Sequence, residues 1–278
     1  MFTALATLID RLDTPSTSRT DVISWGAPVP SFGDLFTATV ATLGLNPSNR
    51  EFVDEDGNEL SGTVRRFHTL NSLGLESWAD ADSRHLQLII DSCRLYFDGN
   101  PYDRWFKRLD QIVLGANASY YSRFAGACHL DLIPYATSRK WTELAPLQKS
   151  ELLSLAADTL ALLLRDSEVR ILILNGRSVV DHFQVMTGVH LDCKPMREWS
   201  LPRQGTDVQG FSYTGTIVSL SNIQLRNPIK VLGYNHNIQS SFGVTTKVIH
   251  SIRDWIASVT SEGLNETERS SASRRAER

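Results

Sequence analysis

Residues 169–176 read VRILILNG, an apolar run closed by an asparagine and a glycine. The run has no polar face, which is typical of a strand buried on both sides of a parallel sheet. The next segment, SVVDHFQVMTG (178–188), has apolar residues at helical spacing and ends at Gly188. A buried strand that leads directly into a helix is the repeating unit of α/β folds.

Three other segments share this strand character. They are FTATVATLGL (36–45), ACHLDLIPYAT (127–137) and PIKVLGYN (228–235). Residues 197–222 alternate like a hairpin around RQGTDVQG. The sequence therefore predicts a three-layer α/β/α sandwich with a central, mostly parallel, four-stranded sheet in one domain, residues 1–260. The polar segment 261–278 is expected to be a disordered tail.

Charge, cysteine content and the length of the apolar segments argue against several classes of protein. The chain of 278 residues has a formal net charge of -3, so any contact with nucleic acid requires a local basic patch. Its three cysteines are far apart, which argues against a disulfide framework or a four-cysteine metal site. The start, MFTALATLIDRLD, has the pattern of an amphipathic helix and not of a signal peptide, and the leucine-rich run 152–164 is too short to span a bilayer. We expect a cytoplasmic protein.

Polar clusters follow three of the four predicted strands. They are Asn46-Pro47-Ser48, Asn175-Gly176-Arg177-Ser178 and Asn235-His236-Asn237, and the fourth strand carries His129 and Asp131. Ligands of open α/β sheets bind at the carboxyl ends of the strands, so these clusters are expected to form the site. The chain lacks the P-loop, nucleophile-elbow, dinucleotide and H-E-x-x-H motifs. The predicted site therefore relies on amide, imidazole and carboxylate groups.

GLNPS (44–48) and the His-containing loop 236–241 resemble the two signature motifs of the uracil-DNA glycosylase superfamily. The resemblance covers about residues 20–258. In the second motif, Asn237 and Ile238 replace the serine and proline that follow the histidine in the family. The resemblance implies a uracil-DNA-glycosylase-like fold and a DNA glycosylase that cleaves a nucleotide flipped out of duplex DNA, with no cofactor and no metal. We expect it to act as a monomer.

This resemblance assigns the chemistry to Asn46 and His236. Asn46 would hold the attacking water, and His236 would donate a hydrogen bond to the departing base. The rest of the first motif is expected to line the substrate pocket: Gly44, Leu45, Pro47 and Ser48. Taken alone, Asn46-Pro47 is equally an ordinary turn, and His236 alone is an ordinary surface histidine.

Asp131 falls where relatives carry the asparagine that reads the Watson–Crick edge of uracil. An ionised aspartate only accepts hydrogen bonds, so it suits the N4 amine of cytosine better than O4 of uracil. The expected substrate is therefore a modified cytosine, such as the glucosylated hydroxymethylcytosine of phage DNA, in an antiviral role. The alternative is a structural carboxylate paired with Arg139 or Lys140. His129 is expected either beside the substrate or as a satisfied core histidine.

Further residues near the motifs are candidates for substrate and DNA contacts. Phe52 or Phe67 is expected to stack on the flipped base unless both belong to the core. Glu51 either assists the water or is a solvated carboxylate at a helix start. DNA contacts are expected from Arg177, Ser178, Asn237, Gln239, Ser240 and Ser241. Two other functions stay open, a repair glycosylase for uracil or another deaminated base and a DNA-binding module without catalysis.

Overall fold

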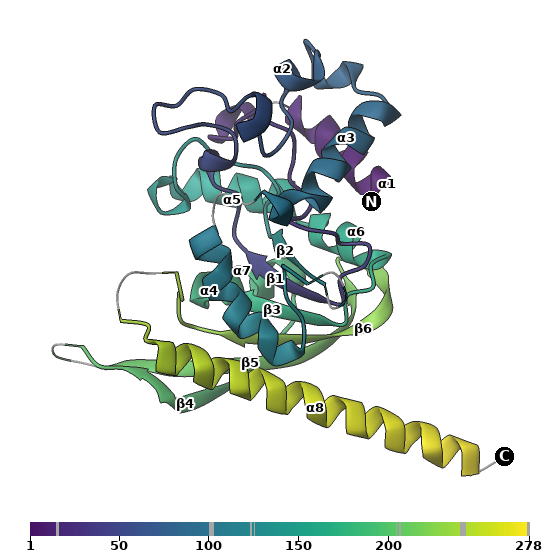
Figure 1. Ribbon diagram of the computed structural model, residues 1–278, viewed down its shortest axis with the longest axis vertical. Coiled ribbons are helices and arrows are strands. Elements are labelled where there is room, and N and C mark those ends of the chain that lie inside the picture. Colours follow the sequence, from purple (N-terminus) through teal and green to yellow (C-terminus); the bar gives the residue numbers. More distant parts are fainter. Residues whose placement is uncertain are drawn as a thin grey trace.

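The computed structural model describes residues 1–14, 17–99, 103–122, 124, 126–203, 205, 207–239 and 243–276. These residues form a six-stranded sheet in the order β2-β1-β3-β6-β5-β4 (Figure 1). The first four strands of that order are parallel, and β5 and β4 continue the sheet in antiparallel orientation. The strands are β1 (Val40–Gly44), β2 (Ala127–Asp131), β3 (Ile171–Asn175), β4 (Asp192–Leu201), β5 (Val208–Leu220) and β6 (Ile223–Tyr234).

The four parallel strands are those that the sequence predicted, but the prediction of a four-stranded sheet is wrong. The predicted hairpin forms β4 and β5, and it joins the sheet because β5 pairs with β6 from Ser212↔Tyr234 to Ile217↔Ile229. Without the hairpin, β6 would be an edge strand with a row of unpaired backbone groups. The hairpin satisfies those groups and extends the sheet.

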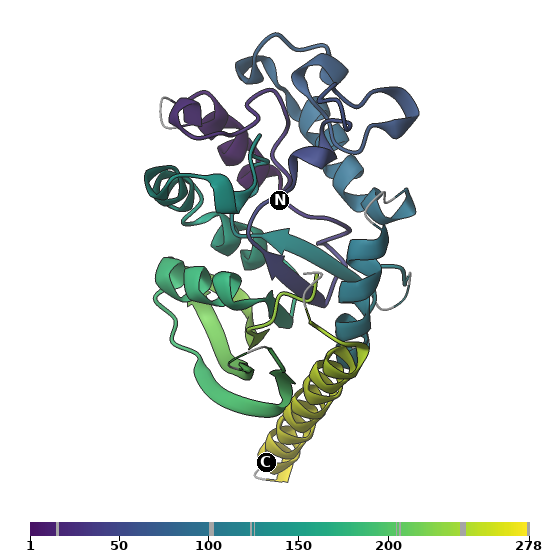
Figure 2. The ribbon, with the colours of Figure 1, turned by 90° about the vertical axis from the view of Figure 1, so that its left-hand side faces the viewer.

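Helices cover both faces of the sheet. Figure 2 shows the blue α4 and the yellow α8 on one side of the strands and the green α7 on the other. The remaining helices, apart from α6, gather above the sheet in Figure 1. The α-helices are α1 (Phe2–Leu12), α2 (Leu70–Leu73), α3 (Ser83–Arg94), α4 (Asp103–Val113), α5 (Pro146–Leu155), α6 (Thr159–Arg165), α7 (Arg177–Thr187) and α8 (Thr246–Ala276). Short 3₁₀ segments are η1 (Thr17–Arg19), η2 (Asn49–Glu51), η3 (Gly62–Val64), η4 (Trp78–Asp80), η5 (Tyr96–Asp98), η6 (Leu114–Ala116) and η7 (Trp141–Glu143).

The two faces of the sheet differ in chemistry. The face under α4 and α8 packs against many aromatic rings, whereas the face under α6 and α7 is largely aliphatic. Successive residues of a strand point to opposite faces, so Ala41 and Leu43 face the aliphatic side while Thr42 and Gly44 face the aromatic side. By the same alternation, the polar residues of β2 lie on the aromatic side.

The last helix differs from the expectation for the polar tail. α8 continues to Ala276, so the backbone of the segment predicted to be disordered from residue 261 is helical here. Its Glu, Arg, Ala and Ser residues are tolerated in helices, which makes this continuation compatible with the sequence. Within the described part of the chain, no helix is both long enough and apolar enough to cross a bilayer.

Candidate active site

A tight group of three residues lies where β1 and β2 end. Gly44 pairs with Asp131 across the two parallel strands, and His129 lies two residues earlier on β2, on the same face. His129 Nε2 is 3.4 Å from Asp131 Oδ1. A Cβ at position 44 would collide with Asp131 Oδ1 and come within 2.9 Å of His129 Nε2. Glycine is therefore required here because the carboxylate and the imidazole occupy the space above β1.

The amide of Asn46 is held in one orientation. Its Nδ2 donates to Thr137 Oγ1 at 3.0 Å and to the carbonyl of Pro47 at 3.1 Å. The Thr137 hydroxyl gives its own proton to the carbonyl of Arg139 at 2.7 Å, so it offers Asn46 only a lone pair. The amide oxygen Oδ1 consequently points away from these partners, and it bonds to none of the described residues. Asn46 thus presents a fixed hydrogen-bond acceptor just beyond β1.

The rest of the first motif shapes the turn. Leu45 is partly buried against the aliphatic core and accepts the backbone N–H of Ile133 at 2.9 Å. Pro47 is buried, and Ser48 is exposed. Ser48 Oγ accepts the N–H of Arg50 at 3.2 Å and so caps the start of η2. This cap turns the chain back toward the sheet directly after the motif.

The turn carries Glu51 inward, where it is only 3% exposed, so the expectation of a solvated carboxylate is wrong. Tyr96 donates its hydroxyl to Glu51 Oε1 at 2.9 Å, and Arg66 Nη1 lies 3.8 Å from Oε2. Burial raises the pKa of Glu51 from 4.5 to about 8, although Arg66 and Tyr96 both act to lower it. Glu51 is therefore protonated at neutral pH. Its Oε2 is buried and has no hydrogen-bond partner among the described residues.

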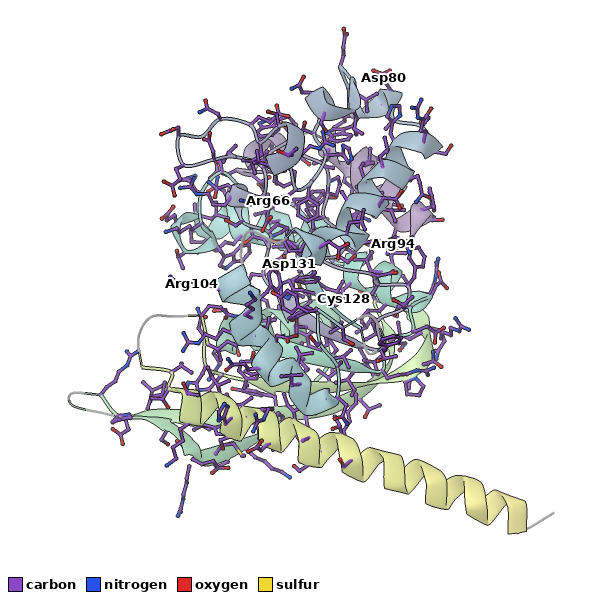
Figure 3. All side chains as sticks on the ribbon, viewed as in Figure 1. Arg66, Asp80, Arg94, Arg104, Cys128 and Asp131 are labelled. Carbon is purple, nitrogen blue, oxygen red and sulfur yellow. The ribbon has the colours of Figure 1, made fainter. Side chains whose placement is uncertain are left out.

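Asp131 is 4% exposed, and its negative charge contributes to the raised pKa of Glu51. Figure 3 shows Asp131 near the centre of the molecule, between Arg66 on the loops above and Cys128 within the sheet. The alternative pairing of Asp131 with Arg139 is wrong, because Arg139 forms its ion pair with Asp21. The other suggested partner, Lys140, is exposed. The neighbour of Asp131 is instead His129, which is buried as a core histidine would be.

Aromatic rings enclose this group on the α4 side. Phe52 is 1% exposed and packs against Trp25 and Phe67, with ring centroids 6.2 and 5.9 Å away. A base cannot stack on a ring enclosed in this way, so Phe52 and Phe67 belong to the core. Trp105 of α4 is partly exposed and meets the ring of His129 edge-on at 5.3 Å. Sequence reasoning missed Trp105 because no motif marks it.

The second motif lies further along the same rim. Only β3 separates β6 from β1, so His236 and Asn46 follow strand ends about two strand spacings apart, roughly 10 Å. His236 is 3% exposed, and its Nε2 bonds to the carbonyl of Trp199 at 2.6 Å. A carbonyl only accepts, so Nε2 carries the proton, and burial lowers the pKa of the ring. The neutral ring then has only an acceptor, Nδ1, for any ligand.

Two of the expected DNA contacts start α7. Arg177 is exposed, but its Nε donates to Asp181 one turn later at 2.9 Å. Any phosphate would have to compete with that carboxylate for the guanidinium group. Ser178 is exposed in the first turn of α7, where helix N–H groups favour anions.

The remaining expected contacts follow His236. Asn237 is exposed and accepts the N–H of Gln239 at 3.1 Å. Gln239 Oε1 accepts from Asn175 Nδ2 at 3.2 Å, so this side chain ties together the loops after β3 and β6. Ser240 and Ser241 lie outside the described residues.

A surface hollow of about 520 Å³ opens beside Glu51. Arg66 and Tyr96, the two side chains that approach Glu51, form part of its lining. Asp91 and Ser92 of α3 add polar groups, and valine and leucine side chains add apolar surface. The hollow therefore combines hydrogen-bonding groups with nonpolar surface.

The rim of β1 and β2 thus holds an oriented amide, a protonated carboxyl group and a carboxylate. Within the described residues, no three His, Cys, Asp or Glu side chains converge as a metal ion would require. The amide can position a water, the acid can give up a proton and the carboxylate can accept hydrogen bonds from an amine. No known family model and no curated protein sequence matches this chain.

Proposed function

We propose that the chain is a monofunctional DNA glycosylase that hydrolyses the N-glycosidic bond of a flipped, modified cytosine and leaves an abasic site. The observation that carries this proposal is the group at the ends of β1 and β2, formed by Asn46, Glu51 and Asp131. Hydrolysis of this bond requires a positioned water, a stable departing base and a means of recognising that base. Each of the three side chains has the chemistry for one of these requirements.

Asn46 positions the water in the proposed reaction. The bond between C1′ of the sugar and the base nitrogen breaks, and its electron pair leaves with the base, which takes a proton from Glu51. The water oxygen bonds to C1′ and loses one proton, which returns to the Glu51 carboxylate. The sugar becomes so electrophilic that a well-placed water suffices without a strong base. Support comes from the bonds of Asn46 to Thr137 and Pro47, which leave Oδ1 as the outward acceptor.

Glu51 supplies the proton that the base takes away. A cytosine-type base that is protonated leaves as a neutral molecule, which is far easier than departure as an anion. Glu51 carries a proton at neutral pH because burial raises its pKa to about 8. Tyr96 bonds to Oε1, so the proton resides on Oε2, the oxygen without a partner. His236 does not take this role in the proposal, because its donor is engaged by Trp199.

Asp131 selects the base. Its neighbour on β2, His129, faces Oδ1, and Oδ2 forms no hydrogen bond with the described residues. A carboxylate oxygen accepts from an exocyclic amine and is repelled by a carbonyl oxygen in the same place. This preference favours cytosine-type bases over uracil.

The hollow beside Glu51 would hold the substituent of a modified cytosine. A substituent at C5 of cytosine needs space outside the pocket that holds the ring. The hollow of about 520 Å³ shares Arg66 and Tyr96 with the surroundings of Glu51 and is lined by polar and apolar groups. Such a lining suits a glycosyl substituent, which has both hydroxyl groups and nonpolar ring faces.

Oligonucleotide cleavage tests the proposal. Duplexes with uracil, hypoxanthine, hydroxymethylcytosine or glucosylated hydroxymethylcytosine are incubated with the protein and then treated with alkali, which cuts abasic sites. We expect cleavage of a modified cytosine, and a reversed preference toward uracil in Asp131→Asn. Preferential cleavage of uracil or hypoxanthine by the wild-type protein would identify a repair glycosylase. Binding of duplexes without any abasic site would identify a non-catalytic DNA-binding module.

A further inference from the structure

Four buried polar side chains form a chain on the aromatic face of the sheet. The hydroxyl of Tyr120 is 2.5 Å from Thr42 Oγ1, which is 2.7 Å from His129 Nδ1. His129 Nε2 in turn lies 3.4 Å from Asp131 Oδ1. Thr42 and His129 are direct register partners on β1 and β2, and none of the four residues is more than 6% exposed. The proposed reaction itself uses only the last member of this chain.

The hydrogen bonds of these four side chains are satisfied in only one direction of donation, from Tyr120 through Thr42 to His129. Burial raises the pKa of Tyr120 well above its ordinary value, so the phenol keeps its proton. Among the described residues, Thr42 Oγ1 is the acceptor within reach of that proton. If Thr42 accepts from Tyr120, its own proton points to His129 Nδ1, and the ring carries its proton on Nε2, facing Asp131.

The reverse direction leaves two conflicts. A proton on His129 Nδ1 would be donated to Thr42, and Thr42 would then donate to Tyr120. The buried phenol proton would have no acceptor among the described residues, and the bare Nε2, an acceptor, would lie 3.4 Å from a carboxylate oxygen, which also only accepts. A buried donor without a partner loses its bonds to water and gains none in return, so the reverse direction is disfavoured.

We infer that Tyr120, Thr42 and His129 form a directional relay that presents an N–H group to Asp131 and keeps that carboxylate a pure acceptor for an amine-bearing base. A bare Nε2 would allow Asp131 to take a proton and to offer it to a carbonyl. When Nε2 carries a proton, protonation of Asp131 Oδ1 would place two protons against each other and is therefore disfavoured. The three residues are thus positioning residues that act on base selection through Asp131. The direction of the relay follows from the contacts and the burial of these residues, whereas its effect on base choice rests on the proposed function.

The protonated ring nitrogen of His129 shows the direction of donation along the relay, and it can be identified in the protein without DNA. In protein labelled with ¹⁵N-histidine, NMR distinguishes a protonated from an unprotonated ring nitrogen, and His129→Gln identifies the signals. We expect the Nε2–H tautomer in the wild-type protein and in Thr42→Ser, which keeps the hydroxyl. Thr42→Val keeps the shape without the hydroxyl and should redistribute the tautomers. An Nδ1–H ring in the wild-type protein, or identical ring signals in Thr42→Val, would overturn the relay.

Binding measurements test the consequence for base selection. Duplexes carry hydroxymethylcytosine or hydroxymethyluracil, which differ at position 4 of the base, on a fluorinated sugar that resists hydrolysis. The ratio of the two dissociation constants gives the preference for the cytosine ring. We expect this preference for cytosine to fall about tenfold in Thr42→Val, as for an unpaired buried group, and to persist in Thr42→Ser. Thr159→Val is the matched control, because Thr159 is equally buried but lies on α6.

The two measurements separate the possible failures. An unchanged preference in Thr42→Val, with redistributed tautomers, would overturn the effect on base selection while the relay itself stands. A wild-type protein that binds neither duplex would refute the proposed function, and the ring signals would still decide the relay. Equal losses of preference in Thr42→Val and Thr159→Val would show a general packing effect and overturn the inference.

Discussion

Replacing Glu51 by glutamine should remove a pH dependence from the stability of the protein. Glutamine has the same shape and still accepts the hydroxyl of Tyr96, which now bonds to Oε1 at 2.9 Å. The wild-type carboxyl group has a folded pKa of about 8 and an ordinary pKa of 4.5. Between these values the folded protein holds a proton that the unfolded chain releases. The wild-type protein therefore loses stability as pH rises toward 8, and the variant does not.

The clearest interval for this effect begins near pH 6.5. Below it, His68 also titrates, because burial lowers its pKa from 6.5 to about 4, and its stabilising effect changes with the opposite sign. From about pH 6.5 to the pKa of Glu51 is about 1.5 pH units, each equivalent to about 1.36 kcal/mol. The wild-type protein should thus lose about 2 kcal/mol relative to the glutamine variant between about pH 6.5 and pH 8.5.

Urea unfolding at the two pH values measures this difference, with the free energy extrapolated to water. Glu55→Gln is the matched control, because Glu55 is exposed only a few residues away and should leave the pH dependence as in the wild-type protein. If Glu51→Gln and the wild-type protein show the same change between the two pH values, Glu51 is ionised in the folded state. The proton donor of the proposed reaction would then be lost as well.

Three other substitutions probe the geometry of the site. Asn46→Ala should slow base release about a hundredfold in single-turnover assays, because the water loses its acceptor, and unchanged rates would remove Asn46 from the reaction. Gly44→Ala should lower the free energy of unfolding in urea by about 1–3 kcal/mol, because its Cβ would collide with Asp131; equal stability would contradict the tight packing described here. Gly99→Trp, whose side chain would enter open space at the hollow, should slow cleavage of glucosylated more than of unsubstituted hydroxymethylcytosine; equal effects would place the substituent elsewhere.

The sequence predicts the parallel part of the sheet well. Strands such as β3 are apolar on both faces, and that pattern depends only on the strand itself. The sequence does not predict where the hairpin lies, because β5 mixes buried and exposed positions, and such a strand suits either a separate hairpin or an extension of the sheet. Only the unpaired edge of β6 decides between them, and pairing across strands is not a local property of either segment.

In the site, too, the features set by neighbouring residues can be predicted from the sequence, whereas those set by distant segments cannot. The turn at Asn46 follows from a short motif, and the structure indeed ends β1 there. The burial of Glu51 does not follow from the motif, because its surroundings come from Tyr96 and Arg66, which no spacing rule connects to it. The expected donor of His236, its Nε2–H, instead bonds to the carbonyl of Trp199 on the edge strand β4. Hydrogen-bond partners supplied by distant segments decide the protonation of each group, and a motif does not record them.

The neighbouring carboxyl groups of Glu51 and Asp131 explain why acid and acceptor occur together at this rim. Two buried negative charges repel each other, so the arrangement is stable only if one of the two groups is neutral. Burial and the charge of Asp131 both raise the pKa of Glu51, which makes Glu51 the neutral member. Asp131 has the imidazole of His129 as its neighbour, with Nε2 3.4 Å from its Oδ1. In the proposed reaction, this pair of side chains would therefore supply both the proton donor for the departing base and the acceptor for its amine.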